Sequence, residues 1–494
     1  MKTSNLLRIA ATLAVALLLA VPATAQAQAD FTTFVTLGDS TALGTVDGCI
    51  VDYGQRDAFG AIIARLANTA FEEPLIGKPG VGVFAPGCLY VISLAPAPVL
   101  GTRPSTGVPI NATLPRPYNN LAVDGSTMGD IVDKTSSPTD ADPRAYMVLR
   151  GQGTAAQQAA ALKPTFLIVS AGSNDILGAA EYATPIDGVT MTPLPIFQAK
   201  TAQVMAALKA AQGGTAKGFF VSLATSIPFI DTLSPILGIN PATGAPIYAL
   251  YDTCPAGIPA CPIPAGSKLT LLAADLLKAG YGIPCAIAPT NPNCNKPLPD
   301  NLKINPSTGA ISPGVVLTPA EQAVIYQRVN DVNNTIAAQA ATAGYKFLDL
   351  APLRTQLATT GVSYGGMTVT SAFLSGGYYS NDGAHESSLG QAIKASAMVQ
   401  FIRDNWGNDL PQVDLYPYLF DGNTSAGGYP VGAALSPSDQ LDWAAAIFNP
   451  ENMEYGLRYF APQPTLGHRS TADPRGMPIS TDPGIPATGR EQVN

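Results

Sequence analysis

Histidine is scarce in this chain, with two copies among 494 residues. Charged residues make up only 13% of the sequence and the net charge is −8, which argues against nucleic acid and anionic membrane surfaces as partners. Beyond the N-terminal region no apolar run reaches the length of a membrane-spanning helix. Because 46% of the residues are hydrophobic, the chain can still bury a large core. We therefore expect a soluble protein with no integral membrane segment beyond its N-terminal region.

The N-terminus has the layout of a secretory signal peptide. Lys2 and Arg8 form a basic start, an apolar run covers Ile9 to Val21, and small residues follow. We assign residues 1–29 to this leader and expect export to the periplasm or the cell exterior. The alternative is an uncleaved membrane anchor, for which the apolar run is short. Cleavage is expected after one of three alanines, Ala25, Ala27 or Ala29.

All six cysteines follow the leader, and an even number in an exported protein suggests disulfide bonds. Six cysteines allow 15 connectivities. We favour pairing between sequence neighbours because all six lie in loop-like sequence rich in Pro and Gly. The favoured pairs are Cys49–Cys88, Cys254–Cys261 and Cys285–Cys294. No close cysteine pair has the CxxC spacing and histidine is scarce, so we expect no metal and no cofactor.

Strand-like apolar runs alternate with helix-like periodicity from residue 30 to residue 406. Strands are predicted at 33–37, 166–170, 219–224 and 347–350, and helices at 58–68, 197–211, 319–343 and 389–405. This alternation predicts an α/β domain built on a parallel sheet.

Several stretches depart from this alternation. The long segments at about 74–118 and 228–317, rich in Pro, are expected to be insertions into the 30–406 domain. Residues 407–468 are predicted to form an extension that packs on the domain. Residues 469–494 are polar and rich in Pro and Gly, and we expect them to form a disordered tail.

An acyl-transfer site needs a nucleophile, a base and a group that orients the base. The chain has two histidines, so the histidine candidates for the base are His385 and His468. His468 lies in the polar C-terminal stretch, where a solvated side chain is expected. His385 lies at the entry to a predicted helix, three residues after Asp382, so the carboxylate can meet one imidazole nitrogen across a turn. The alternative is that Asp382 and His385 only form a capping turn, with Ser387 or Ser388 as the N-cap.

Three further stretches place candidate groups in loops. Gly38-Asp39-Ser40 ends the first predicted strand and is either an ordinary turn or a turn that presents the Ser40 hydroxyl. Asn174 follows a buried strand, so its amide either points over the carboxyl edge of the sheet, where ligands bind in open α/β folds, or caps the next helix. Gly125 precedes a helix and offers either a bare backbone N–H or an ordinary turn.

Together and in this order, the four stretches resemble the signature blocks of the SGNH (GDSL) hydrolase family. The blocks match as Gly38-Asp39-Ser40, Gly125, Gly172-Ser173-Asn174-Asp175 and Asp382-Gly383-Ala384-His385. The resemblance covers about residues 34–406, with the two insertions outside the common core. It implies a flavodoxin-like three-layer α/β/α sandwich with a central parallel sheet.

The resemblance also implies a role for each block. Ser40 would be the nucleophile, His385 the general base and then acid, and Asp382 the carboxylate that orients the base. The oxyanion hole would consist of the Ser40 N–H, the Gly125 N–H and the Asn174 side chain. Asp39 is expected to hold the turn.

Two residues depart from the family pattern. Thr41 follows the nucleophile where leucine is frequent, and Glu386 follows the histidine where proline is frequent. We expect the carboxylate of Glu386 to raise the pKa of His385.

These residues predict an exported serine esterase or lipase that cleaves a small-molecule or lipid ester through an acyl-enzyme. Alternatives that use the same triad are a carbohydrate O-deacetylase and an acyltransferase, and a less favoured alternative is a non-catalytic surface-binding module. Apolar residues of the first insertion would suit a lid against an acyl chain, or they simply pack over the sheet. These residues are Phe84, Leu89, Tyr90, Val91, Ile92 and Leu94.

Overall fold

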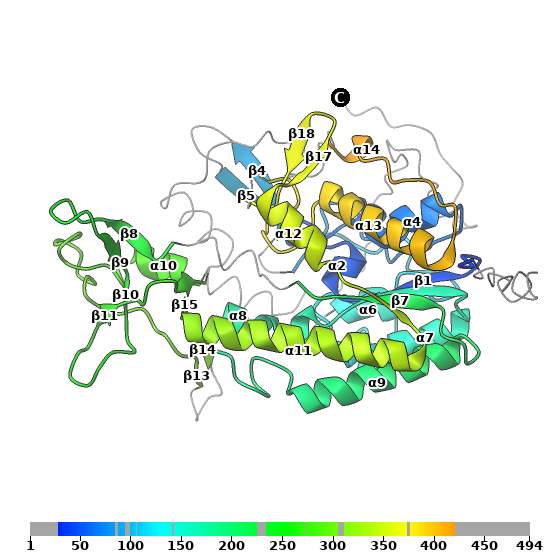
Figure 1. Cartoon of the computed structure of the whole chain (residues 1–494), viewed down its shortest axis with the longest axis horizontal. Coiled ribbons are helices and arrows are strands. Elements are labelled where there is room, and N and C mark those ends of the chain that lie inside the picture. Colours follow the sequence, from blue (N-terminus) through cyan, green and yellow to red (C-terminus); the bar gives the residue numbers. More distant parts are fainter. Residues whose placement is uncertain are drawn as a thin grey trace, which may run out of the picture.

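The computed structural model describes residues 28–419, apart from 84–86, 94–98, 105, 141–142, 225–233, 271, 305–310 and 373–375. Its centre is a four-stranded parallel sheet in the order β1-β6-β7-β16 (Figure 1). The strands are β1 (Phe34–Gly38), β6 (Phe166–Ser170), β7 (Gly218–Val221) and β16 (Lys346–Leu348). All four carboxyl ends therefore meet at one edge of the sheet, which we call the carboxyl edge.

A fifth extended segment, residues 119–123, lies along the free side of β1. The N–H of Leu121 donates to the carbonyl of Thr36 (2.8 Å), and the N–H of Val123 donates to the carbonyl of Gly38 (3.0 Å). With this segment counted second along the chain, the spatial order is the flavodoxin-like one. The fold class predicted from the sequence is confirmed.

Helices cover both faces of the sheet and complete the three layers (Figure 1). One face carries α4 (Phe59–Leu66) and α13 (Ser388–Trp406), and the other carries α7 (Ala155–Leu162), α9 (Leu194–Ala211) and α11 (Pro319–Ala343). A capping box formed by Thr318 and Glu321 opens α11, the helix predicted at 319–343. Helix α9 begins three residues earlier than predicted because Pro195 fits the first turn of a helix.

Aromatic side chains of the strands form the centre of the core. All five residues of β6 are buried, as expected for a parallel strand covered on both faces. The ring of Phe166 lies 5.0 Å from that of Trp406 at the end of α13, and Phe219 of β7 lies 5.1 Å from Phe401. These edge-to-face contacts attach α13, and with it the segment that precedes it, to the sheet.

The first predicted insertion is attached to the rest of the domain by strand pairing and by a disulfide. Strand β2 (Cys49–Ile50) pairs with β3 (Val81–Gly82), and β4 (Gly87–Ser93) forms a hairpin with β5 (Val99–Pro104). The Cys49–Cys88 bond links the two parts. Leu89 is buried, which favours packing over the sheet for this residue, and Phe84 and Leu94 lie outside the described residues.

The second predicted insertion projects from one end of the domain (Figure 1). It contains disulfides Cys254–Cys261 and Cys285–Cys294, so all three expected pairs are present. The elements in its described residues are two-stranded pairs and one helix: β8 (Ile236–Ile239) with β9 (Pro246–Tyr248), β10 (Leu250–Tyr251) with β11 (Cys261–Pro262), β12 (Lys268–Leu269) with β15 (Val316–Leu317), β13 (Lys303–Ile304) with β14 (Ile311–Ser312), and α10 (Ala273–Lys278).

The remaining elements are short. They are α2 (Ser40–Leu43), α3 (Asp52–Arg56), α5 (Asp130–Asp133), α6 (Arg144–Leu149), the 3-10 helix η1 (Ser173–Asp175), α8 (Leu177–Glu181), α12 (Ala351–Thr359), β17 (Val362–Tyr364), β18 (Met367–Val369) and α14 (Tyr416–Leu419).

The start of the predicted C-terminal extension packs on the domain, with Leu410, Val413 and Leu415 buried. Residues 420–494, which include His468 and the predicted tail, lie outside the described residues, as do residues 1–27 of the predicted leader. None of the helices in the described part of the chain is long and apolar enough to cross a membrane.

Candidate active site

Ser40 lies at the carboxyl edge because β1 ends in a tight turn. Gly38 has a φ of +147°, and a Cβ there would lie 1.8 Å from the carbonyl oxygen of Ser170 on β6, so the close approach of the two strands requires glycine. Asp39 then caps α2 by accepting hydrogen bonds from the N–H and the hydroxyl of Thr41, both at 3.1 Å. Ser40 is the first residue of α2 and is half-buried.

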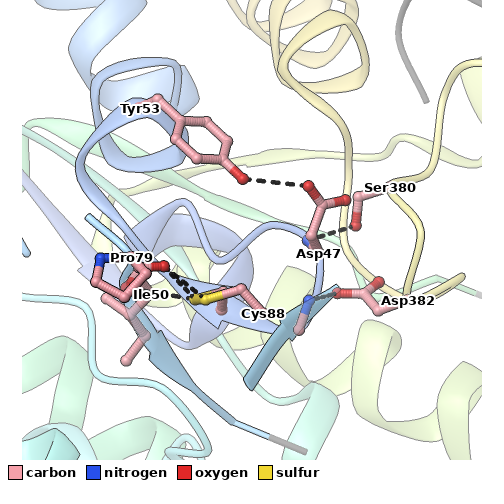
Figure 2. The surroundings of a disulfide bond; sticks show 9 residues. Asp47, Ile50, Tyr53, Pro79, Cys88, Ser380 and Asp382 are labelled. Atoms are coloured by element: carbon pink, nitrogen blue, oxygen red, sulfur yellow. Dashed lines mark hydrogen bonds between the residues drawn. A yellow bond between two sulfur atoms is a disulfide. The ribbon is translucent and has the colours of Figure 1, made fainter. Parts of the chain in front are cut away.

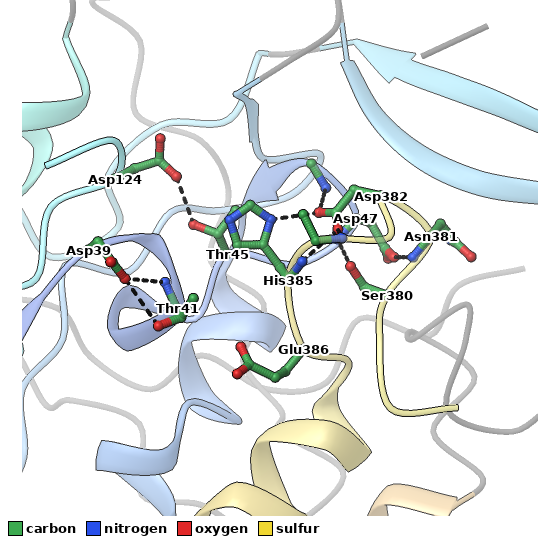
Figure 3. A network of polar contacts seen from close by, with 12 residues as sticks. Asp39, Thr41, Thr45, Asp47, Asp124, Ser380, Asn381, Asp382, His385 and Glu386 are labelled. Carbon is green, nitrogen blue, oxygen red and sulfur yellow. Dashed lines mark hydrogen bonds and ion pairs between the residues drawn. The ribbon is translucent and has the colours of Figure 1, made fainter. Parts of the chain in front are cut away.

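Asp382 and His385 form a buried pair within one turn (Figure 3). The Nδ1 atom of His385 lies 2.8 Å from Oδ2 of Asp382. The same carboxylate accepts hydrogen bonds from the backbone N–H groups of Ala384 (2.9 Å), His385 (2.8 Å) and Gly48 (2.6 Å). Since the Asp382 side chain is fully buried, this set of donors satisfies a charge that would otherwise be costly in the protein interior.

The surrounding charges shift the pKa values of the pair in opposite directions. Burial alone would lower the pKa of His385, but the charge and hydrogen bond of Asp382, together with the charges of Asp124 and Glu386, raise it to about 9. Burial alone would raise the pKa of Asp382, but His385 and the backbone donors hold it below its usual value. The expected influence of Glu386 on His385 is confirmed in direction, behind that of Asp382.

The helix after this pair has a cap of its own. Ser387 is the N-cap of α13 and accepts a hydrogen bond from the N–H of Gly390 (3.0 Å). The hydroxyl of Ser388 instead donates to Asp57 (2.5 Å). Capping and the Asp382–His385 hydrogen bond are thus both present, so a capping turn alone does not account for this stretch.

The loops that carry Gly125 and Asn174 contact each other. Gly125 follows the segment beside β1 and is exposed, with a φ of +71°. Asn174 lies in η1 directly after β6, and its Nδ2 atom donates to the carbonyl of Ser126 (2.9 Å). Asp175 accepts a hydrogen bond from the N–H of Met128 (2.7 Å). The Asn174 amide therefore binds the loop next to Gly125 and does not cap the following helix.

Two bridging residues join these blocks and were not singled out from the sequence. The Thr45 hydroxyl donates to Asp124 (3.0 Å), the residue before Gly125, and Asp124 also forms an ion pair with Arg144 (2.6 Å). The N–H of Thr45 in turn donates to the carbonyl of Ser40 (3.0 Å). An acidic residue beside the candidate glycine was the available signal for Asp124, whereas nothing in the local sequence marks Thr45.

The loop that donates to Asp382 is itself held by polar contacts (Figure 2). Asp47, which has a φ of +57°, accepts from the N–H of Asn381 (3.0 Å) and from the hydroxyl of Tyr53 (3.2 Å). Its own N–H donates to the hydroxyl of Ser380 (3.0 Å). Residues 45–48 therefore contact both the Asp124 loop and the stretch before His385.

Within the described residues, no cluster of three or more His, Cys, Asp or Glu side chains is placed to hold a metal ion.

The structure brings the predicted stretches to one edge of the sheet, where hydrogen bonds of Thr45, Gly48 and Ser126 link them. These stretches are the ones that contain Ser40, Gly125, Asn174, Asp382 and His385. The fold and these contacts define an α/β sandwich with a buried Asp–His pair at the carboxyl edge.

Comparison with solved structures shows two distant likenesses among others. The chain is similar to a phospholipase A1 from Streptomyces albidoflavus, with 12% identity, coverage of 74% of this chain and 98% of that chain, and a TM-score of 0.29. It is similar to an extracellular lipase from Streptomyces rimosus with 13% identity, the same coverages and a TM-score of 0.29. Protein-family models and curated proteins give no match.

Proposed function

We propose that this protein is an exported serine hydrolase that cleaves carboxylic esters through an acyl-enzyme. The observation that carries the proposal is the buried Asp382–His385 pair at the sheet edge where the turn after β1 presents Ser40. A carboxylate that accepts four hydrogen bonds while facing an imidazole orients that imidazole for proton transfer. The four sequence blocks that resemble the SGNH hydrolases support the same assignment.

In the proposed acylation, the Ser40 oxygen attacks the ester carbonyl carbon while Nε2 of His385 accepts the hydroxyl proton. Asp382 keeps the Nδ1–H tautomer and stabilises the imidazolium that forms. When the tetrahedral intermediate collapses, the alcohol leaves with the proton from Nε2. A water molecule then attacks the acyl-enzyme, His385 takes its proton and returns it to Ser40, and the carboxylic acid is released.

The oxyanion of each tetrahedral intermediate is assigned to three donors. These are the N–H groups of Ser40 and Gly125 and the side-chain amide of Asn174. One amide hydrogen of Asn174 is used by the carbonyl of Ser126, which fixes the orientation of the side chain and directs the second hydrogen elsewhere. Preorganised donors of this kind act in the transition state without reorganisation at the moment of reaction.

The first insertion supports an apolar acyl group in the substrate. Its backbone joins the loop that holds Asp382, since the N–H of Val83 donates to the carbonyl of Gly48 (2.8 Å) and the N–H of Leu89 donates to that of Asp47 (2.9 Å). An apolar segment so close to the proposed site can form a wall for an acyl chain.

The proposal is tested with a series of p-nitrophenyl esters from acetyl to palmitoyl. We expect Ser40→Ala to lower kcat by on the order of 10³-fold or more with its thermal unfolding unchanged. His385→Ala should lose activity, whereas His468→Ala, the matched control, should keep it. Retained activity in folded Ser40→Ala would remove the nucleophile, and the acyl length that gives the highest kcat/KM separates deacetylase, esterase and lipase.

A further inference from the structure

Helix α13 carries a lysine on its buried face. The side chain of Lys394 is only 3% exposed, in a protein interior where lysine is rarely found unless it is paired. Its Nζ atom lies 3.0 Å from Oε1 of Glu386 and 3.4 Å from the hydroxyl of Thr41, and 5.2 Å from the centre of the Phe59 ring. This lysine takes no part in the chemistry proposed above.

The two polar partners of Lys394 are the residues next to the proposed nucleophile and base. Thr41 follows Ser40, and Glu386 follows His385. They are also the two positions at which this chain departs from the family pattern that it resembles. One ammonium group therefore connects the turn that presents Ser40 with the segment that carries His385.

A second side chain from the same face of α13 repeats the connection. The Nε2 atom of Gln391, one turn before Lys394, donates to the carbonyl of Thr41 (2.9 Å) and to Oε2 of Glu386 (3.4 Å). Gln391 also accepts from the N–H of Phe59 (3.0 Å), which attaches this contact to α4. Both carboxylate oxygens of Glu386 are thus held by α13.

The charges around this cluster are predominantly negative. His385 faces Asp382, Asp124 and Glu386. Lys394 contacts Glu386 and also acts on Asp39: burial raises the pKa of Asp39, and the charge of Lys394 offsets part of that rise. Burial raises the pKa of Tyr378 and Tyr379, the charge of Glu386 adds to that rise, and the charge of Arg354 opposes it. Without the lysine, the carboxylate of Glu386 would lose its cation in a buried site.

We propose that Lys394 is a positioning residue for this site, which holds Thr41 and Glu386 in place and neutralises the carboxylate next to His385. The effect of Lys394 on catalysis rests on the proposed function. Its effect on the protonation of His385 does not depend on that function. The two members of the pair have opposite charges, so their removal must shift the proton affinity of His385 in opposite directions. A residue that contributed only packing would not give opposite shifts in the pKa of His385 when Lys394 and Glu386 are removed in turn.

The test measures the pKa of His385 directly, by NMR titration of protein with isotope-labelled histidine. The chain has two histidines, so His468→Gln assigns the signals. We expect Lys394→Met to raise the pKa of His385 and Glu386→Gln to lower it, each by on the order of one unit. The Glu386→Gln/Lys394→Met double variant should return the value toward that of the wild type.

The matched control is Lys303→Met, which removes an exposed lysine from its ion pair with Asp252 (3.2 Å) in the second insertion and should leave the titration unchanged. Thermal unfolding of each variant shows that it is folded. Unchanged values, or shifts of the same sign in both single variants, would overturn the proposal.

Ester hydrolysis provides a second readout. In Lys394→Met we expect kcat to fall by roughly tenfold to a hundredfold at unchanged KM, because Ser40 and His385 lose their relative placement. The titration needs no substrate, so the two proposals fail separately. Opposite shifts in a protein without esterase activity would overturn the proposed function alone, and esterase activity without the shifts would overturn the role of Lys394 alone.

Discussion

The backbone N–H of Gly48 lies 2.6 Å from the Oδ2 atom of Asp382, the same oxygen that faces the imidazole of His385. The next residue, Cys49, is bonded to Cys88 of the first insertion (Figure 2). The orientation of the proposed base is therefore connected, through one peptide unit, to a disulfide.

We predict that Cys49→Ser/Cys88→Ser lowers both stability and activity. The bond closes a loop with a sequence separation of 39, so its loss should reduce the free energy of unfolding by about 4 kcal/mol. Because Gly48 then holds Asp382 less rigidly, kcat should also fall roughly tenfold at temperatures where the variant is folded. Urea unfolding and steady-state hydrolysis of a p-nitrophenyl ester measure the two effects.

Cys285→Ser/Cys294→Ser is the control for this prediction. This disulfide lies in the projecting insertion with a separation of 9, so its loss should reduce the free energy of unfolding by about 2.5 kcal/mol and leave kcat unchanged. An equal loss of kcat in both double variants would show that the Cys49–Cys88 bond has no particular effect on the site.

The elements that local sequence determines were predictable, and the contacts between them were not. The continuous apolar run of β6, the glycine that ends β1 and the Thr318–Glu321 capping box each depend on neighbouring residues. The hydrogen bond between Gly48 and Asp382 joins residues 334 positions apart, so no local sequence pattern predicts it.

The buried position of Lys394 could be predicted from the sequence, but its partners could not. A single cation within the apolar stretch Leu389–Val399 indicates a buried charge that needs a partner. The identity of that partner follows only from the fold, which places α13 against the turn at Thr41. Residues that act through tertiary contacts were for this reason missed from the sequence, whereas residues in short signature blocks were found.

Ester hydrolysis should increase with pH up to an alkaline midpoint. Only the neutral imidazole of His385 can accept the proton of Ser40, and Asp382 and its neighbours raise the pKa of His385 to about 9. The log of kcat/KM against pH should therefore rise with unit slope and level off near pH 9. Asp382→Asn should lower both the rate and the midpoint, because the charge that favours the imidazolium is gone; a midpoint that does not move would contradict the pairing.

The same shift predicts how stability varies with pH. The pKa of His385 is higher in the folded protein than the ordinary value of about 6.5 in the unfolded chain. Its contribution to the free energy of unfolding is thus present below about pH 6.5 and is lost as the pH rises through about 9. Urea unfolding of wild type and Asp382→Asn across this range measures the contribution, which should be smaller in the variant.

If the chain is exported as we propose, its mature N-terminus should retain Gln28 and Ala29. The side chain of Gln28 donates to the carbonyl of Gly407 (3.2 Å), and Ala29 exchanges two hydrogen bonds with Asn408 (2.7 and 2.9 Å). Residues that form part of the fold are poor candidates for removal, so we expect cleavage after Ala25 or Ala27. Intact mass and N-terminal sequencing of the secreted protein decide this, and a first residue of Asp30 would contradict it.

Substitution of Gly125 by alanine should affect catalysis more than stability, and Gly213 provides a matched comparison. Both glycines have a left-handed backbone, with φ of +71° and +73°. A Cβ at Gly213 meets nothing within 4 Å, and one at Gly125 makes only an ordinary 3.5 Å contact with Arg144. Each substitution should therefore cost about 1 kcal/mol of unfolding free energy through backbone strain alone.

The two variants should differ in activity. In Gly125→Ala the new methyl group lies beside the N–H assigned to the oxyanion, and the strained peptide no longer holds that donor in place. We expect kcat to fall by on the order of tenfold to a hundredfold with KM little changed, whereas Gly213→Ala keeps wild-type kcat. Equal activity in the two variants, measured with the same ester and with matched losses in unfolding free energy, would remove Gly125 from the proposed oxyanion hole and leave its donors to Ser40 and Asn174.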